Sequence, residues 1–356
     1  MHSLTEKYLR HLSFSTGEAA AMRTLGEYQG KQALFYKQSP ETLESLKQVA
    51  VIESSESSNR LEGITAPKER IEALVLKNST PKDRSEQEIA GYRDALSMIH
   101  EAAERKEFPA SEVIPFSTNV ILQIHSTICR FMPNPGGKWK PTDNEITETH
   151  PDGTKRVRFV PTTAVQTPQA MEDLVKNYQQ AIKPPLNQDP LIVIPLAVLD
   201  FLCIHPFSDG NGRAARLLTL MLLYHFDYRV GRYISLERVF EETKESYYET
   251  LEKSSQGWHQ GQHDVHPWLN YFWGALTRAY REFEERVGNV KAGRGSKTDQ
   301  IRQAVQRKIG PFAISDVEDA CPGVSRDMVR NVLRQMKEEN LIESTGKGRS
   351  AKWVKK

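Results

Sequence analysis

The sequence predicts a mainly α-helical protein with one small β-hairpin in its body and a winged helix-turn-helix domain at its C-terminal end. Apolar residues recur at three- and four-residue spacing through most of the 356 residues, which is typical of amphipathic helices. Segment 144–161 differs: a turn at Pro151-Asp152-Gly153 precedes an arm, 155–160, in which polar and apolar residues alternate. Segment 298–356 orders three helices before a short hairpin, which is the winged helix-turn-helix order.

The helices of the body are predicted from their start signals and their apolar periodicity. Ser39 and Pro40 form one start, because serine caps helices and proline suits the first helical position. Asp189 and Pro190 form another, although Pro195 leaves its boundary open by several residues. The other helices expected in the body lie within residues 85–103, 117–130, 217–226 and 246–253.

The tail and the domain divisions follow from the same signals. The tail is expected to hold helices 299–309, 315–321 and 325–340, then strands 341–345 and 351–354 around the turn 346–348. Segment 288–297 is rich in glycine and basic residues and has little to bury, so it is predicted to be a linker. The predicted divisions are an N-terminal helical region 1–110, a core 111–287, the linker 288–297 and the tail domain 298–356.

Composition and charge limit the class of protein. With 38% hydrophobic and 26% charged residues, the chain resembles ordinary globular proteins. Its three separated cysteines form no disulfide framework, and its longest apolar run, 191–204, is too short for a bilayer, so a cytoplasmic protein without a membrane segment is expected. Residues 291–356 hold 15 basic and 8 acidic residues (net +7), against 33 and 38 in the rest (net −5), which favours an acidic partner or nucleic acid for the tail.

The segment 205–216, His-Pro-Phe-Ser-Asp-Gly-Asn-Gly-Arg-Ala-Ala-Arg, carries the strongest chemical signal. Two glycines around Asn211 allow backbone N–H groups to turn toward one anion, and a helix beginning near Gly212 would aim its free N–H groups at the same point. Arginines at positions 213 and 216 share one helix face and can fork onto phosphate oxygens. With Asp209 as an oxygen ligand for Mg²⁺ and His205 as a base, the segment predicts a nucleotide-phosphate site.

A second interpretation of the same residues is a dinucleotide site. Residues 210–215 match the fingerprint GxGxxA, and Asp227 and Glu237 follow at loosely suitable distances. That fingerprint requires a βαβ unit, whereas the surrounding pattern is helical with no second βα pair. No Walker A sequence occurs in the chain.

Residues 205–216 fit every position of the Fic motif, and the sequence thus resembles Fic-domain protein adenylyltransferases. The resemblance implies a helical Fic core that binds ATP and Mg²⁺ and transfers AMP to a Ser, Thr or Tyr hydroxyl of a protein, itself included, releasing pyrophosphate. In it His205 would be the general base, and Asp209 would hold Mg²⁺ between the α- and β-phosphates. The phosphates would be held by Gly210, Asn211, Gly212, Arg213 and, in support, Arg216. Fic-fold kinases related to the Doc toxin carry lysine where this chain has Gly212, which favours AMP transfer here.

Residues 58–63 resemble the inhibitory motif of the same family, Ser/Thr-x-x-x-Glu-Gly/Asn. Ser58 and Glu62 are four residues apart and so share one face of a helix. The resemblance implies that Glu62 pairs with Arg213, removes this arginine from the γ-phosphate and holds ATP unproductively. The sequence is therefore expected to belong to the autoinhibited class with the inhibitory helix N-terminal to the Fic motif.

Two further regions correspond to parts of the family's site. The hairpin 144–161 occupies the place of the flap, which docks the target segment, and its residues Arg156, Val157, Arg158 and Phe159 are expected to contact target and nucleotide. The region lining the adenine pocket corresponds to Tyr248 and Ser255, the latter where the family often has Asn or a small polar residue.

Several alternatives remain at the level of the sequence. One is a nucleotide-sensing, DNA-binding regulator, because Arg326 and Arg330 lie where a recognition helix contacts DNA; the tail could equally bind a protein. Another is a Fic enzyme that transfers a different phosphate-containing group, and a homo-oligomer is also open. His259, His263 and His266 have spacings that metal sites use, but we interpret them as solvated histidines because no cysteine or carboxylate cluster accompanies them.

Overall fold

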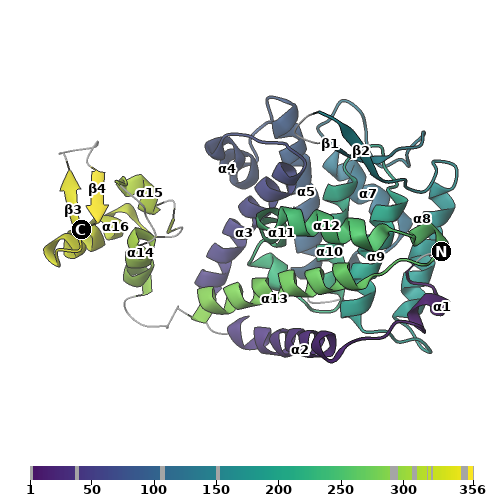
Figure 1. Ribbon diagram of the computed structural model, residues 1–356. Coiled ribbons are helices and arrows are strands. Elements are labelled where there is room, and N and C mark those ends of the chain that lie inside the picture. Colours follow the sequence, from purple (N-terminus) through teal and green to yellow (C-terminus); the bar gives the residue numbers. More distant parts are fainter. Residues whose placement is uncertain are drawn as a thin grey trace. The chain divides into compact units, whose positions relative to one another are not determined.

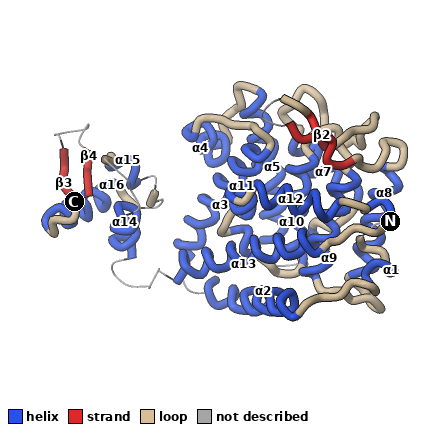
Figure 2. Tube along the Cα trace, viewed as in Figure 1, coloured by secondary structure: helices blue, strands red, loops and turns tan. Residues whose placement is uncertain are grey.

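The computed structural model describes residues 3–36, 40–104, 109–149, 153–288, 296–306, 311–318, 320–321, 324–345 and 352–355. The chain forms two compact units, one of Met1–Leu34 with Leu46–Glu284 and the other of Phe35–Ser45 with Glu285–Lys356. Helices dominate the described residues, and strands occur in two short hairpins (Figure 1, Figure 2). Among these residues, no helix has both the length and the apolar composition that a membrane span needs.

The helices that precede residue 289 agree with the predicted segments and add several that periodicity did not single out. They are α1 (Glu6–Leu9), α2 (Thr16–Tyr36), α3 (Pro40–Leu61), α4 (Lys68–Lys77), α5 (Arg84–Glu104), α6 (Ala110–Val113), α7 (Thr118–Ile128), α8 (Thr167–Ala181), α9 (Pro190–Ile204), α10 (Asn211–His225), α11 (Leu236–Glu242), α12 (Lys244–Ser255) and α13 (His266–Gly288). Because α5 packs on α7 and α10, residues 46–284 form one unit, and the boundary predicted at residue 110 does not separate compact units. Most of the predicted linker lies outside the described residues.

Helices α9 and α10 lie side by side at the centre of the first unit (Figure 1). All residues of α9 after Pro190 are buried except Leu202, which explains the continuous apolar run as a core helix. The Asp189 carboxylate caps α9 by accepting a hydrogen bond from the N–H of Leu191 at 2.8 Å. The helix ends at His205 in the left-handed region (φ 50°), and the following loop reaches α10 through Gly210 (φ 76°). The two central helices therefore fix both ends of the loop 205–210.

The predicted hairpin is confirmed. Strands β1 (Ile146–Thr149) and β2 (Lys155–Phe159) pair antiparallel, with Glu148 opposite Arg156 and a bulge beside Ile146. The predicted turn residues 151 and 152 lie outside the described residues.

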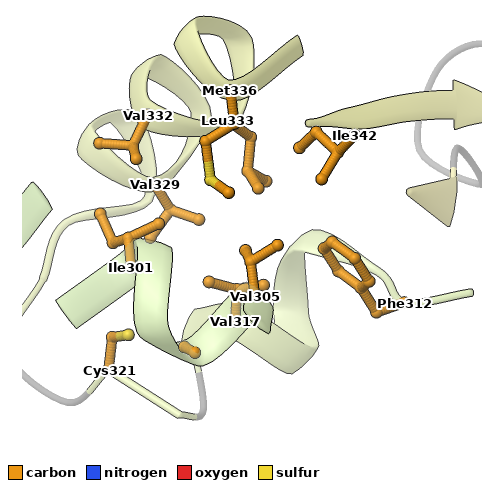
Figure 3. Packing of buried hydrophobic residues seen from close by; sticks show 11 residues of the cluster. Ile301, Val305, Phe312, Val317, Cys321, Val329, Val332, Leu333, Met336 and Ile342 are labelled. Atoms are coloured by element: carbon orange, nitrogen blue, oxygen red, sulfur yellow. The ribbon is translucent and has the colours of Figure 1, made fainter. Parts of the chain in front are cut away.

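The C-terminal segment has the predicted order of elements. It consists of α14 (Ser296–Gln306), α15 (Ile314–Glu318), α16 (Arg326–Glu338) and the hairpin of β3 (Ile342–Thr345) and β4 (Lys352–Lys355). Phe312 joins the hairpin, exchanging two backbone hydrogen bonds with Trp353. Figure 3 shows the apolar core, in which Val332, Leu333 and Met336 of α16 face the residues of α14 and Ile342. The predicted turn 346–348 lies outside the described residues, and the assignment to the winged helix-turn-helix class stays a prediction.

A buried carboxylate ties the N-terminal segment to α9, five residues before the loop. Asp200 Oδ1 accepts hydrogen bonds from Ser3 N (3.0 Å), Ser3 Oγ (2.5 Å) and Trp258 Nε1 (2.6 Å), and Asp200 and Ser3 are both fully buried. Ser3 Oγ also lies 2.8 Å from His263 Nε2, which donates to it. Because a buried carboxylate needs its donors, Ser3 is expected to stabilise this end of the unit.

Substitution of Ser3 is expected to destabilise the protein. Ser3→Ala removes one donor to Asp200 and the partner of His263, so we expect the free energy of unfolding to fall by about 1–3 kcal/mol. Denaturant unfolding measures the change, with Ser13→Ala, an exposed serine of the same segment, as the control. An unfolding free energy equal to that of the control would show that the cluster does not hold the segment.

The prediction that His259, His263 and His266 are all solvated is wrong. His263 is not solvated: it is 5% exposed and stacks on the Tyr8 ring with centroids 4.5 Å apart. His266 is half-buried and lies 2.7 Å from the Glu18 carboxylate, while His259 is exposed. The described residues contain no group of three His, Cys, Asp or Glu side chains arranged to hold a metal ion.

Candidate active site

A cavity of about 460 Å³ collects most of the predicted site residues in one place. Five parts of the chain line it: the end of α3 with Glu62, the last turns of α9, the loop and helix with His205, Gly212 and Arg216, the β1–β2 hairpin, and helix α12. Tyr248 and Ser255 line it from α12, as the adenine-pocket prediction requires. Residues more than 150 positions apart in sequence thus share one concave site.

His205 has a neutral imidazole with one nitrogen free of a hydrogen. Its Nδ1 lies 3.3 Å from the Leu202 carbonyl oxygen, so Nδ1 carries the hydrogen and Nε2 keeps its lone pair. Burial lowers the pKa of His205 to about 4 against the opposing effect of this hydrogen bond, and the nearby Lys140 cation lowers it further. The imidazole is therefore neutral at pH 7, which is the state that a general base requires.

The loop after His205 is held by its own side chains and by the segment that leads to the hairpin. The Asn211 amide accepts from Phe207 N (2.9 Å) and donates to Phe207 O (2.7 Å), so only its backbone N–H remains for a phosphate. Lys140 Nζ donates to Ile204 O at 3.1 Å, and Asn144 Nδ2 donates to Phe207 O at 3.1 Å. Burial lowers the pKa of Lys140 to about 8. Sequence reasoning missed Lys140 and Asn144, because no spacing links them to the motif.

His125 is a second residue that the motif did not reveal. Its ring stacks on Phe207 with centroids 3.6 Å apart, Nδ1 accepts from Gly137 N (2.9 Å), and Nε2 therefore donates to Asp209 O (3.0 Å). Burial lowers the pKa of His125 to about 4, which keeps this tautomer neutral. His125 consequently supports the loop from α7 and takes no part in the cavity lining.

Asp209 has the exposure and free oxygen that a Mg²⁺ ligand needs. Its side chain is 72% exposed, Oδ1 accepts from Gly210 N at 2.6 Å, and Oδ2 lies 3.8 Å from Arg213 Nη2. Magnesium in phosphate sites is held by one or two carboxylates together with the phosphates of the substrate, so this carboxylate fits the ion.

The two motif arginines have different partners, and one prediction is wrong. Glu62 pairs with Arg216, not with Arg213: Glu62 Oε1 lies 2.7 Å from Arg216 Nη2. Arg216 also donates to Ser58 Oγ and Ser58 O, both at 2.8 Å. Arg213 instead pairs with Glu88 of α5 at 2.6 Å. The end of α3 lies over the Arg216 side of α10, whereas the Arg213 side faces α5.

Gly212 makes room for the Glu62 carboxylate. A Cβ atom at this position would lie 2.2 Å from Glu62 Oε1 and 3.1 Å from Arg216 Nη1. Burial, the largest single effect, disfavours the charged form of Arg216, but the Glu62 carboxylate and the nearby Tyr247, Tyr92 and Tyr248 together outweigh it, so the pKa of Arg216 is raised. Glu62 therefore lies directly on the first turn of α10, where phosphate oxygens are expected to bind.

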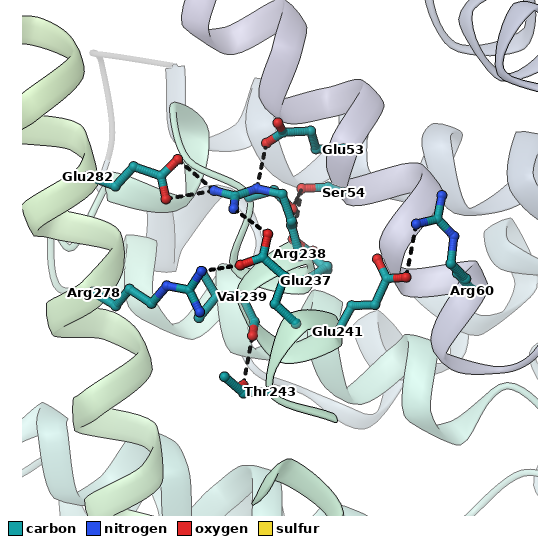
Figure 4. Close-up of polar contacts among 12 residues, drawn as sticks. Glu53, Ser54, Arg60, Glu237, Arg238, Val239, Glu241, Thr243, Arg278 and Glu282 are labelled. Carbon is teal, nitrogen blue, oxygen red and sulfur yellow. Dashed lines mark hydrogen bonds and ion pairs between the residues drawn. The ribbon is translucent and has the colours of Figure 1, made fainter. Parts of the chain in front are cut away.

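Helix α3 is anchored at several points away from the cavity (Figure 4). Three successive polar contacts join it to α11: Glu53 with Arg238 (3.0 Å), Ser54 with Glu237 (2.7 Å) and Arg60 with Glu241 (3.0 Å). Glu237 is fully buried and also accepts from the Tyr92 hydroxyl at 2.7 Å, while Arg238 forms two 2.7 Å contacts with Glu282 of α13. These contacts fix the position from which Glu62 reaches Arg216.

Two of the four predicted flap residues line the cavity, as do both predicted adenine-pocket residues. Arg158 and Phe159 line the cavity, whereas Val157 (48% exposed) and Arg156 do not. Tyr248 donates its hydroxyl to Leu61 O at 3.3 Å, which joins α12 to the end of α3. The Ser255 hydroxyl donates to Glu252 O at 2.9 Å, so its oxygen lone pairs are what it can offer a base.

Comparison with known proteins agrees with this geometry. Residues 115–223 match the model of the Fic/DOC family. A protein named protein adenylyltransferase Fic, from Nematostella vectensis, is 26% identical over 223 residues, which are 60% of this chain and 44% of that protein. The chain thus spans less than half the length of this curated relative.

Solved structures share the fold. A Fic family protein from Desulfovibrio desulfuricans G20 superposes with a TM-score of 0.61 at 20% identity, covering 97% of both chains. A Fic domain containing signaling protein from Bacteroides thetaiotaomicron VPI-5482 has a TM-score of 0.60 at 22% identity, covering 75% of this chain and 97% of that one. The mainly helical architecture with a small hairpin is therefore that of Fic-fold proteins.

Proposed function

Because the chain contains a Fic domain, we propose that it is an autoinhibited protein adenylyltransferase that uses ATP and Mg²⁺. The observation that carries this proposal is the neutral His205 imidazole, whose free Nε2 shares a cavity with the N-terminal turn of α10 and with Arg216. A base, an anion site and a guanidinium in one cavity are the parts that transfer of a phosphate-containing group to a hydroxyl requires.

In the proposed reaction, Nε2 of His205 accepts the proton of a Ser, Thr or Tyr hydroxyl of the target. A bond forms between that oxygen and the α-phosphorus, and the bond from the α-phosphorus to the bridging oxygen of pyrophosphate breaks. The backbone N–H groups of Asn211 and Gly212 at the start of α10 are proposed to face the phosphates, which the N–H of Gly210 would join on leaving Asp209 Oδ1 (2.6 Å). Arg216 is proposed to hold the distal phosphates, and Arg213 would join it on leaving Glu88 (2.6 Å). Asp209 would hold Mg²⁺, which supplies charge neutralisation beside the phosphates.

Autoinhibition follows from the contact between Glu62 and Arg216. While the carboxylate holds this guanidinium at 2.7 Å and covers Gly212, Arg216 is withdrawn from the γ-phosphate, and the space above the first turn of α10 is occupied by the carboxylate. A triphosphate that binds there is then not aligned for in-line attack, and alignment is a large part of catalysis in phosphorus transfer.

The experiment that tests this function identifies the modification itself. The Glu62→Gly protein is incubated with ATP, Mg²⁺ and a cell lysate, and modified peptides are mapped by mass spectrometry. AMP esters on Ser, Thr or Tyr are expected, on the protein itself and on its target. Phosphate esters alone would favour the second candidate, transfer of a different phosphate-containing group, which the neutral His205 would also serve.

The C-terminal domain is proposed to bind DNA or a protein. Arg326 and Arg330 lie on the first turns of α16, where their side chains are more than half exposed. Each has a carboxylate at 3.3 Å, Glu318 for Arg326 and Asp327 for Arg330, and such exposed pairs are weak enough to exchange for a phosphate.

If this domain binds duplex DNA, the affinity of the full chain should fall steeply as salt rises, because lysine and arginine release counterions from DNA. Arg330→Ala should weaken binding and reduce the salt dependence, whereas Arg10→Ala, at an exposed arginine directly after α1, should leave both unchanged. Gel-shift titrations at low and moderate salt measure this. The absence of a shift at low salt would favour a protein partner instead.

A further inference from the structure

The hairpin of β1 and β2, called the flap below, depends on contacts with its surroundings. A two-stranded hairpin is only marginally stable by itself, so its position over a site must be set by other elements. Strand β2 packs on α12, whose residues Tyr248, Glu252 and Ser255 line the same cavity as Arg158 and Phe159 of β2. The contact between β2 and α12 therefore determines how far the flap covers the cavity.

Glu252 receives both arginines of β2. Its Oε1 lies 2.7 Å from Arg156 Nη2, and its Oε2 lies 2.9 Å from Arg158 Nε and 2.7 Å from Arg158 Nη2. Each carboxylate oxygen thus has its own guanidinium. Charge-assisted hydrogen bonds of this kind are stronger than those between neutral groups.

The Arg158 side of this contact is the more buried one. The side chains of Arg158 and Glu252 are 16% and 22% exposed, whereas that of Arg156 is 51% exposed. Arg158 Nη2 also donates to Tyr248 O at 2.9 Å, and its guanidinium lies 5.9 Å from the centre of the Tyr248 ring. Partial burial reduces the screening of this pair by water and salt.

The end of β2 nearest the core is held by different contacts. Phe159 stacks on His259 with centroids 5.4 Å apart, and His259 Nε2 donates to Val160 O at 2.8 Å. These contacts are apolar or neutral and do not involve Glu252. Loss of the Glu252 carboxylate is therefore expected to free residues 155–158 while the strand end stays in place.

We propose that Glu252 is a positioning residue that holds β2 of the flap over the cavity by pairing with Arg156 and Arg158. This inference rests on the proposed function only in that the cavity takes ATP and the target hydroxyl. It also assigns the two flap arginines, predicted to contact target and nucleotide, to an internal contact. The flap is then kept closed by a carboxylate of the nucleotide pocket itself.

The direct test is backbone hydrogen exchange of the full chain. Glu252→Gln keeps the size of the side chain and removes its charge, so the amides of β2 should exchange about five- to tenfold faster than in wild type. Glu249→Gln is the matched control, since Glu249 lies on the same helix and pairs with Lys253 at 2.7 Å, with both side chains 60% exposed. This readout needs no transferase activity, so it stands or fails separately from the proposed function.

The kinetic test uses self-modification with labelled ATP in the Glu62→Gly background. Glu252→Gln should raise the KM for ATP about fivefold and change kcat less than twofold, because a better-held flap binds ground state and transition state alike. Arg158→Met should raise the KM for ATP similarly. The KM of the double variant should not exceed that of the single variant with the higher KM, since all three variants remove the same contact.

Three outcomes would overturn the proposal. Exchange in Glu252→Gln equal to that of Glu249→Gln would show that the carboxylate does not hold the strand. Faster exchange with unchanged KM would show that the held flap does not matter to the reaction. Additive effects of Glu252→Gln and Arg158→Met on KM would mean that Glu252 contacts the nucleotide directly.

Discussion

Glu62→Gly is expected to raise the rate of AMP transfer about 100-fold, which is the scale of restoring one preorganised cationic or hydrogen-bond contact to a transition state. The reason is the 2.7 Å contact of Glu62 with Arg216 and the position of the carboxylate on Gly212. Its removal frees the guanidinium and the first turn of α10 together. Turnover should rise more than ATP affinity, because the triphosphate is realigned and not merely bound more tightly.

The arginine responsible can be identified by comparing two backgrounds. If Arg216 is the partner, Glu62→Gly should bring no further gain in an Arg216→Ala protein, whereas it should still activate an Arg213→Ala protein, whose lost contact is with Glu88. Glu69→Gly, an exposed residue of α4, is the control. Transfer rates are measured with labelled ATP. Equal rates for wild type and Glu62→Gly would mean that residues 58–63 are only a helix end.

His205→Ala is expected to lower transfer by about 10²–10⁴-fold in the Glu62→Gly background, the usual contribution of a general base. ATP binding should survive, because the proposed phosphate contacts come from the backbone of α10 and from the arginines. Calorimetry gives the ATP affinity and the label assay gives the rate. A His205→Ala protein that transfers AMP at the parent rate would remove His205 from the mechanism.

The pH dependence follows from the same residue. Burial holds the pKa of His205 at about 4, so the base form persists well below the ordinary histidine value of 6.5. The acidic limb of kcat/KM, which reports the free enzyme, should therefore fall near pH 4 and should be absent from the residual activity of His205→Ala. A limb at pH 6.5 would show that the imidazole is not desolvated as in this cavity.

Local signals predicted most of the fold. The pair Ser39-Pro40 predicted a helix start, and α3 begins at Pro40. Residues 155–160 predicted a strand, and β2 covers Lys155–Phe159. The order of helices and strands after residue 295 was also correct, because short periodic segments bounded by Gly, Ser and Pro carry their own boundaries. The division predicted at residue 110 does not coincide with a boundary between compact units, because α5 packs across it on α7 and α10.

The motif at residues 205–216 predicted which of its residues lie close together, but not which residues elsewhere in the chain contact them. His205, Gly212 and Arg216 line one cavity, and the motif places them within a single loop and helix. The choice between Arg213 and Arg216 as the partner of Glu62 was wrong, because the two arginines are three residues apart on one helix and only the packing of α3 and α5 decides between them. No pattern in the sequence separates these faces.

Residues that support the loop from a distance could not be predicted. His125 and Lys140 hold the loop 205–210 from positions more than 60 residues earlier, and a lone histidine or lysine carries no signal of such a contact. The burial of His263 could not be predicted for the same reason, because its partners Ser3 and Tyr8 come from the far end of the chain.

The position of the transferred phosphorus distinguishes AMP transfer from phosphate transfer. Glu62→Gly protein is incubated with Mg²⁺ and ATP labelled at either the α- or the γ-phosphorus, and the label that stays with protein on a denaturing gel is counted, alongside Glu62→Gly/His205→Ala as a blank. We expect the protein to acquire the α label and no γ label, with release of pyrophosphate. Retention of the γ label, or an α label no greater than in the blank, would show that the protein does not transfer AMP by the proposed mechanism.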